Sequence, residues 1–552
     1  MNVNILIIRN LKIIINLLLI NLLFIGCVKK EIPPAMVSIA GSQAEDSTAV
    51  GIKTEALQKE KYNQLIYVNI NSDTSEDGKK ESPFKSIHAA LDAVNSMAMT
   101  GKVAILIAKG EYSENTIKMQ PNVDFYGGFN APSWERNIDT NKTILYALEG
   151  QRIIEGADNS RLDGFILDKA KVRGKGGAIL CAGVSPVLSN NIFKSNTTLA
   201  PQNWAPKYWH ETANNGGAIF CENGSQAIIR NCMFLNNTTE NGRGAGIAAD
   251  NKCKLRISNN VFINNVSGKN DPMRSSDGGA ISIFNWCQAT IDHNVFLSNR
   301  ALNKNDGGGV FVALWSSAVI DRNIFVDNIA GDDAGGLFVG GQEHRYGGAP
   351  LDPIPATEDF SVHITNNLFF GNKNSSLNSG VMRFTMESKG SYTNNISALN
   401  NGIYFQRSEV SVRKNIILDN FLFIETKNGL LPGEIRDNLI WGDFTLDVNP
   451  LLSGNIIKGK VDSIRQQYKE PKFVKDGSTF SVISLNVNKD NLETTLLTDG
   501  ENVPENNLAH RIIRSGDKWG VIKSNSGSEI TVWGNLYGAE TVQILPTYTL
   551  SK

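Results

Sequence analysis

The stretch Gly278-Gly279-Ala280-Ile281 and, after a short gap, Asn294-Val295-Phe296-Leu297-Ser298-Asn299 decides the fold. Paired glycines permit a tight corner, because glycine adopts positive φ angles without a steric penalty. The small and apolar residues that follow indicate a short buried strand, and the two asparagines bracket a second one around Phe296. A unit this small cannot bury its own apolar side, so copies of it must stack on one another.

Copies of both elements recur from about residue 162 onwards. The glycine element begins at Gly176, Gly216, Gly244, Gly278, Gly307 and Gly335. The phenylalanine of the second element stands at Phe193, Phe234, Phe262, Phe296, Phe325 and Phe369, and five residues before each comes Leu188, Ile229, Ile257, Ile291, Ile320 or Ile364. Constant elements at unequal spacing are typical of a solenoid whose insertions leave on one side. We therefore expect an all-β parallel β-helix in which Phe, Ile and Asn each stack in a column.

The N-terminus has the pattern of an export signal. Arg9 and Lys12 precede a short apolar run at 13–25, which is too short to span a bilayer comfortably. The run ends at Gly26-Cys27, in a sequence that resembles the lipobox of bacterial lipoproteins. The resemblance implies cleavage after residue 26 and acylation of Cys27, with palmitate-like chains holding the protein on the outer membrane, exposed at the surface. An ordinary secretory signal is the alternative.

The remaining chain divides by composition. Residues 27–63 lack a hydrophobic period and are typical of a flexible tether. We expect the β-helix over residues 64–475, with a cap at 64–160 that contains one amphipathic helix, followed by the repeats at 161–475. Several short strands at 476–552 indicate a small C-terminal β module or cap.

The bulk composition excludes some partners. A formal net charge of −1 with 20% charged residues offers no basic surface for nucleic acid. Of the six cysteines, five remain after Cys27, and an odd number does not suit a disulfide framework. Cys181 and Cys221 fall in one column, where we expect small buried apolar groups. We expect a monomer, and no motif requires a cofactor.

The repeats resemble those of known families. The glycine and Phe-x-x-Asn elements are similar to repeats of chlamydial polymorphic outer-membrane proteins. The wider pattern, including Ser160-Arg161-Leu162-Asp163-Gly164-Phe165-Ile166 and Tyr126-Gly127-Gly128-Phe129, resembles right-handed β-helix proteins of the pectin-lyase-like superfamily over residues 64–475. The resemblance implies a right-handed helix. Lyases of that superfamily use an Arg or Lys base beside calcium-binding acids, but Lys175, Arg243 and Arg274 fall in no lyase motif.

Four aspartates are candidate functional residues. Asp277 and Asp306 directly precede their glycine pairs, and Asp332 and Asp333 stand almost in register on the next turn. Carboxylates stacked about 5 Å apart repel one another unless a cation or an arginine joins them. Three interpretations stay open: ordinary Asp-Gly turns, a calcium site formed by all four, or a catalytic set of Asp277, Asp306 and Asp333 with Arg345 from the insertion at 340–360.

Aromatic residues form a second candidate group. The insertion at 197–215 carries Trp204, Tyr208, Trp209 and His210. The eighth residue after the first glycine of three successive repeats is Trp286, Trp315 or Glu343. Exposed rings beside charged groups suit stacking on sugars, whereas the alternative is that they pin loops onto the body.

Three functions fit these patterns. The first is an envelope lipoprotein whose β-helix binds polysaccharide or host glycan, as an adhesin would. The second is a polysaccharide lyase or glycoside hydrolase. The third is a structural envelope protein with no small ligand. The anchor, the repeat body and the aromatic insertion favour the first.

Overall fold

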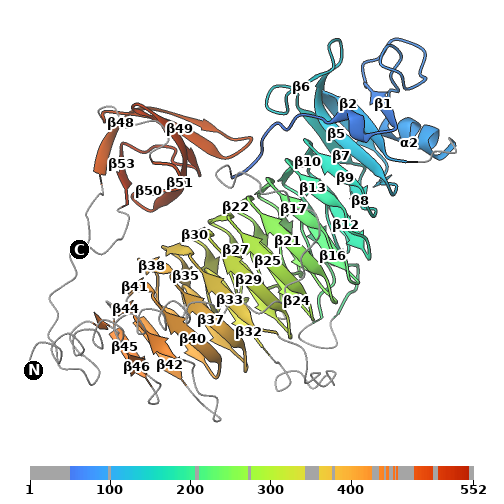
Figure 1. Ribbon diagram of the computed structural model, residues 1–552. Helices are drawn as coiled ribbons and strands as arrows, with labels where there is room; N and C mark the ends of the chain where they lie inside the picture. Colours follow the sequence, from blue (N-terminus) through green and yellow to red (C-terminus); the bar gives the residue numbers. More distant parts are fainter. Residues whose placement is uncertain are drawn as a thin grey trace, which may run out of the picture. The chain divides into compact units, whose positions relative to one another are not determined.

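The computed structural model shows a chain wound into stacked parallel coils, followed by a small barrel (Figure 1). The structure describes residues 50–96, 101–205, 211–270, 275–341, 360–375, 380–419, 434–440, 478–500 and 508–545, together with the backbone of the strands at 421–425, 443–446, 452–453 and 456–457. Among these residues, no helix has both the length and the apolar character needed to cross a membrane.

A single coil passes through up to four sheets, for example through β9 (Arg161–Asp163), β10 (Ile166–Asp168), β11 (Lys171–Arg173) and β12 (Ile179–Ala182). We call these the first, second, third and fourth sheets, in chain order. Successive coils pair in parallel, as β9 does with the next strand of its sheet. Figure 1 shows the second and fourth sheets along opposite flanks of the stack, with the first sheet between them. The predicted right-handed parallel β-helix is confirmed.

The sheets are built from short strands. Besides β9, the first sheet contains β1 (Gln64–Val68), β2 (Val103–Ala108), β5 (Val123–Asn130), β13 (Val187–Ser189), β17 (Ile228–Arg230), β21 (Lys254–Ser258), β25 (Gln288–Asp292), β29 (Ser317–Asp321), β33 (Val362–Thr365), β37 (Lys389–Thr393), β40 (Glu409–Arg413), β43 (Ile435–Arg436) and β46 (Leu452–Ser453), and β6 (Glu135–Arg136) pairs with β5. Besides β10, the second contains β3 (Gly110–Glu114), β7 (Thr143–Ala147), β14 (Ile192–Lys194), β18 (Met233–Leu235), β22 (Val261–Ile263), β26 (Val295–Leu297), β30 (Ile324–Val326), β34 (Leu368–Phe370), β38 (Ile396–Ala398), β41 (Ile416–Leu418), β44 (Leu439–Ile440) and β47 (Ile456–Ile457).

The other two sheets complete the coils. Besides β11, the third contains β15 (Thr197–Leu199), β19 (Thr238–Thr239), β23 (Val266–Ser267), β27 (Arg300–Ala301), β31 (Ile329–Ala330) and β35 (Lys373–Asn374). Besides β12, the fourth contains β4 (Ile117–Lys118), β8 (Ile154–Glu155), β16 (Ile219–Glu222), β20 (Ile247–Ala249), β24 (Ile281–Phe284), β28 (Val310–Ala313), β32 (Leu337–Gly340), β36 (Met382–Thr385), β39 (Ile403–Gln406), β42 (Phe421–Glu425) and β45 (Asp443–Leu446).

The predicted apolar columns form the core. Phe193 and Phe234 stack with ring centroids 4.8 Å apart, and the stacking continues at 4.6–5.0 Å to Phe369. The aliphatic column is in register as well, with Ile257 beside Ile291 and then Ile320. All these side chains are buried, so a coil gains most of its stability from the coils above and below it.

Two buried asparagine ladders mark the corners of the second sheet. The first ladder contains Asn191, Asn260, Asn294, Asn323, Asn367, Asn395, Asn415 and Asn438, with Cys232 between its first two members. The second contains Asn196, Asn237, Asn265, Asn299, Asn328, Asn372, Asn400 and finally Asp419. Where the next member of a ladder is Asn or Asp, Nδ2 donates to its Oδ1, as from Asn294 to Asn323 at 3.0 Å. Such bonds satisfy amides that are out of reach of water.

Both ends carry additional structure. Helix α2 (Ile87–Ser96) buries Ile87, Ala90 and Leu91 against the main core, as predicted for a capping helix. At the C-terminal end of the chain, strands β48 (Ser478–Asn488), β49 (Glu493–Thr498), β52 (Glu529–Trp533), β51 (Lys518–Ser526), β50 (Ile512–Ser515) and β53 (Thr541–Ile544) close into a barrel in that order. Barrel residues Ile512, Val521 and Trp533 share one apolar cluster with the outer face of the second sheet.

Residues 50–62, which the sequence assigns to the tether, form defined contacts with the β-helix. We call this segment the strap; it includes the short 3-10 helix η1 (Lys59–Lys61). The N–H of Gly51 donates to the carbonyl of Asn259 at 2.9 Å, and Tyr62 packs with Tyr126 and Phe129 near α2. The strap has no hydrophobic period because main-chain and polar bonds make up many of its contacts.

The cysteines of the described residues, Cys181, Cys221, Cys232, Cys253 and Cys287, are free and buried. Cys181 and Cys221 are register partners in the fourth sheet, as their common column predicted. Burial raises the pKa of Cys232 to about 12, which keeps that thiol protonated and unreactive at neutral pH.

Candidate functional site

The predicted aspartates line up at the corner that leads into the fourth sheet. Asp277, Asp306 and Asp333 occupy one column, because the N–H of Gly278 bonds to the carbonyl of Asp306 and that of Gly307 to the carbonyl of Asp333. The residue after each aspartate has a positive φ angle, which Gly307 (67°) adopts without strain and for which Ala334 (59°) substitutes in the third copy. Asp333, rather than Asp332, is therefore in register.

The aspartate side chains help to form the corner. Oδ1 of Asp277 accepts the N–H of Asp306 at 3.0 Å, and Oδ1 of Asp306 accepts the N–H of Asp333 at 2.9 Å. Each carboxylate thus accepts a backbone N–H of the next coil. In an ordinary Asx turn, the aspartate accepts an N–H from its own chain segment instead. We call this column the aspartate ladder.

Arginines stand at both ends of the aspartate ladder. Arg243 occupies the preceding place in the column; its Nε lies 3.4 Å from Oδ2 of Asp277, and its guanidinium lies 3.9 Å from the ring centroid of Phe284. At the other end Arg383 of β36 forms an ion pair with Asp333. Burial lowers the pKa of Arg383, against the opposing effect of Asp306, yet an arginine stays charged in proteins. The two cations offset the repulsion between stacked carboxylates.

Three carboxylates meet at the second arginine. One oxygen from each of Asp306, Asp332 and Asp333 lies within 4.8 Å of the other two. Calcium takes six to eight oxygen ligands, so these groups supply part of a coordination sphere. Asp333 is already ion-paired with Arg383, which occupies the place of a cation. The trio therefore fits calcium only where the ion displaces that guanidinium.

The outer face of the fourth sheet adds aromatic side chains. Phe311 and Phe338 stack with centroids 5.1 Å apart, and Trp286 stacks on Trp315 at 4.9 Å. Trp315 is only 3% exposed, whereas Trp286 is half-buried and presents part of its ring. The predicted pair of tryptophans is thus brought together, with one accessible member.

The structure describes one candidate from the insertions. Trp204, half-buried, follows β15 on the path between the third and fourth sheets. The remaining predicted residues, Cys27, Tyr208, Trp209, His210, Glu343 and Arg345, lie outside the described part of the chain. The fourth sheet thus has three carboxylates and an arginine at the corner before its strands, and the partly exposed ring of Trp286 at its other edge, as groups able to contact a ligand.

Sequence reasoning missed Arg383 and Tyr404. They are register partners in adjacent coils, and the Arg383 guanidinium lies 5.2 Å from the ring centroid of Tyr404. Arg383 also donates to Oε1 of Gln406 at 2.5 Å. The sequence of β36 and β39 could have predicted their outward position, because Arg383 and Tyr404 each stand between two apolar residues that face the core.

Comparisons with known proteins agree with the fold. The chain matches the family model described as "Right handed beta helix region" over residues 139–336. No curated protein matches it.

Three solved structures were also similar. A tailspike protein of an Acinetobacter baumannii bacteriophage, described as a capsular polysaccharide depolymerase, is 12% identical, with 89% of this chain and 87% of that chain covered and a TM-score of 0.29. A rhamnogalacturonan lyase is 14% identical (78% and 92% covered, TM-score 0.31), and the catalytic domain of a GH87 α-1,3-glucanase is 11% identical (73% and 70%, TM-score 0.29). Similarities of this size do not bear on what this chain binds.

Proposed function

We propose that this protein is an envelope lipoprotein, acylated at Cys27 and displayed on the outer membrane, that binds a polysaccharide or host glycan along the fourth sheet. The observation that carries the proposal is that the polar groups and the partly exposed ring border the same sheet. Carboxylates that can accept sugar hydroxyls stand at the corner before its strands, and Arg383, which can donate to sugar oxygens, stands on β36. The half-buried ring of Trp286 follows β24 at the other edge of the same sheet. Sugar binding uses this combination of ring faces and polar groups.

Retention on immobilised glycans tests the proposal. The body from residue 30 to 552 is applied to a panel of neutral and acidic polysaccharides. We expect Trp286→Ala and Asp306→Asn to reduce retention on the bound glycan. The control is Tyr537→Ala, which removes a 72% exposed ring on the barrel and leaves the corner unchanged. Retention that is equal in all variants would exclude this corner as the binding site.

The carboxylate trio favours one alternative, a glycoside hydrolase or polysaccharide lyase. Pairs of carboxylates about 5–9.5 Å apart serve as acid, base or nucleophile in glycosidases. The oxygens of Asp306 and Asp333 lie within 4.8 Å, close to that range, although Arg383 holds one of them. New reducing ends from one polysaccharide, lost in Asp306→Asn, would support a hydrolase. A structural protein without a ligand predicts neither retention nor cleavage.

A further inference from the structure

The strap begins between the barrel and the β-helix. Val50 and Ile52 pack against the cluster shared by the second sheet and the barrel. A Cβ built on Gly51 would lie 3.6 Å from Val261 of the second sheet and 3.8 Å from Trp533 of the barrel, so this residue is in contact range of both. The strap therefore begins on the flank of the second sheet.

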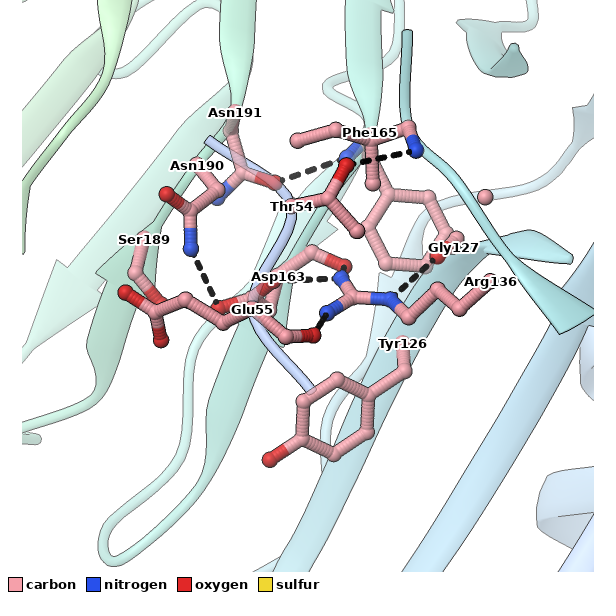
Figure 2. A network of polar contacts seen from close by, with 12 residues as sticks. Thr54, Glu55, Tyr126, Gly127, Arg136, Asp163, Phe165, Ser189, Asn190 and Asn191 are labelled. Atoms are coloured by element: carbon pink, nitrogen blue, oxygen red, sulfur yellow. Dashed lines mark hydrogen bonds and ion pairs between the residues drawn. The ribbon is translucent and has the colours of Figure 1, made fainter. Parts of the chain in front are cut away.

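Polar bonds fasten the strap along several coils. The Lys53 N–H donates to Oδ1 of Asn190 at 3.3 Å, and the Glu55 carboxylate pairs with Arg230 at 3.3 Å. Figure 2 shows Arg136 between the strap and the β-helix: it donates to the carbonyl of Glu55 at 2.8 Å and to Oδ1 of Asp163 at 2.5 Å. These bonds fix the point at which the strap begins.

That point lies near the middle of the stack. Gly51 bonds to Asn259, which follows β21, and β21 is the seventh of the fourteen strands that form the path of the first sheet among the described residues. At about 4.8 Å per coil the stack is about 60 Å long, so each end is about 30 Å from this point. The sequence predicts a flexible tether ahead of the strap, and a flexible chain with the length of residues 28–49 has a root-mean-square span of about 25 Å. A tether of this length holds the point where the strap begins near the lipid anchor. The two ends of the coil stack, about 30 Å from that point, lie further away.

The barrel on this flank carries exposed apolar groups. Ile483, Leu497 and Tyr537 are 63%, 38% and 72% exposed, and they account for half of the large exposed hydrophobic residues in the described chain. Lys518 hydrogen-bonds the main-chain carbonyl of Tyr537, which places an ammonium group on the same turn as an exposed aromatic residue. Aromatic rings next to lysines suit the boundary between headgroups and acyl chains.

We propose that the flank formed by the strap entry, the second sheet and the barrel faces the lipid surface. The fourth sheet, on the opposite flank, then presents the aspartate ladder away from the membrane (Figure 1). This inference rests on the proposed anchoring through Cys27. It adds an orientation: the protein lies along the membrane on its side and does not stand on one end.

Depth-dependent quenching tests the orientation. Full-length acylated protein is placed in phosphatidylcholine vesicles whose headgroups carry a quencher, with a fluorophore at Tyr537→Cys or at Asn303→Cys. Asn303 is exposed near the aspartate ladder, and the native cysteines of the described body are at most 1% exposed and so do not compete for label. We expect several-fold stronger quenching at 537 than at 303. Equal quenching, or stronger quenching at 303, would overturn the orientation.

A flotation step separates this inference from the anchoring on which it rests. The acylated protein should float with the vesicles and Cys27→Ala should not. A wild-type protein that fails to float would overturn the anchoring, and the orientation with it. A protein that floats but shows no difference between the two labels would overturn the orientation alone.

Discussion

Arg243 and Asp277 occupy consecutive places in one column, with Nε 3.4 Å from Oδ2, although the rest of that column is acidic down to Asp333. Both side chains are almost completely buried, at 2% and 5% exposed. The arginine thus ends the run of like charges and also covers the ring of Phe284.

Replacing Arg243 alone should lower the free energy of unfolding more than replacing Arg243 and Asp277 together. Arg243→Met leaves the Asp277 carboxylate buried without this cation, and we expect the free energy of unfolding to fall by about 3 kcal/mol. The double variant Arg243→Met/Asp277→Asn removes the charge pair and should recover more than half of that loss. Urea denaturation at pH 7.5 measures both. A double variant less stable than the single one would show that Asp277 does not depend on this arginine.

The second asparagine ladder ends in an acid, and this predicts a pH dependence. Burial raises the pKa of Asp419 from 3.8 to about 6, and its Oδ1 accepts from Nδ2 of Asn400 at 2.8 Å. Because the folded-state pKa is raised, this group favours folding fully below about pH 4, and the contribution is lost as the pH rises towards 6.

Asp419→Asn should therefore stabilise the protein at neutral pH. Asparagine occupies the equivalent place in the preceding coils, such as Asn372 and Asn400, and carries no charge to desolvate. We expect a higher urea midpoint than wild type at pH 7.5 and little difference at pH 4. A gain that is the same at both pH values would rule out the buried charge as its cause.

Replacing a buried ladder asparagine by alanine should lower the free energy of unfolding more than replacing an exposed asparagine. Asn299→Ala deprives Asn265 Nδ2 of its acceptor at 2.9 Å and leaves buried amide groups without partners, so we expect a loss of about 1–3 kcal/mol or more. The matched control is Asn71→Ala, at an exposed position outside the ladders where the φ angle is not positive. Cys232 already replaces an asparagine in the first ladder, so Asn294→Cys should cost less than Asn299→Ala.

Added calcium should show whether the carboxylates of Asp306, Asp332 and Asp333 bind a metal ion or are neutralised by Arg383. With Arg383 paired to Asp333, we expect millimolar calcium to leave the melting temperature of the wild type unchanged. In Arg383→Gln the three carboxylates lose this cation, and calcium should then raise the melting temperature of the variant. Thermal melts with calcium and with chelator measure both. A calcium-dependent rise in the wild type would show that the ion competes successfully with the guanidinium.

The repeat core was predictable because each coil repeats the same local chemistry. Phe296 and Ile291 could be aligned with their copies by counting residues from each asparagine, and the structure places them in register. The aspartates could be aligned by the glycines that follow them. The third aspartate could not be assigned in this way, because Ala334 replaces the first glycine of its repeat. Asp332 and Asp333 therefore aligned equally well with Asp277 and Asp306.

The partners of those aspartates were harder to predict. Arg383 follows an insertion of unequal length, so the count from Asp333 gives no register, and only the pairing of β32 with β36 brings the two together. The strap was missed for a different reason. Its contacts use the main chain of Gly51, Lys53 and Glu55, and a main-chain bond leaves no hydrophobic pattern in a sequence.

The strap also constrains the order in which the molecule is completed. Gly51 leaves the ribosome long before Trp533, yet the finished fold holds it close to that ring. The start of the strap is therefore synthesised before the rest of the β-helix, but it is covered on both sides only once the C-terminal barrel has folded. A chain that stops before the barrel would lack part of the surface that covers Val50 and Ile52, and this would expose truncated copies to proteases at the start of the strap.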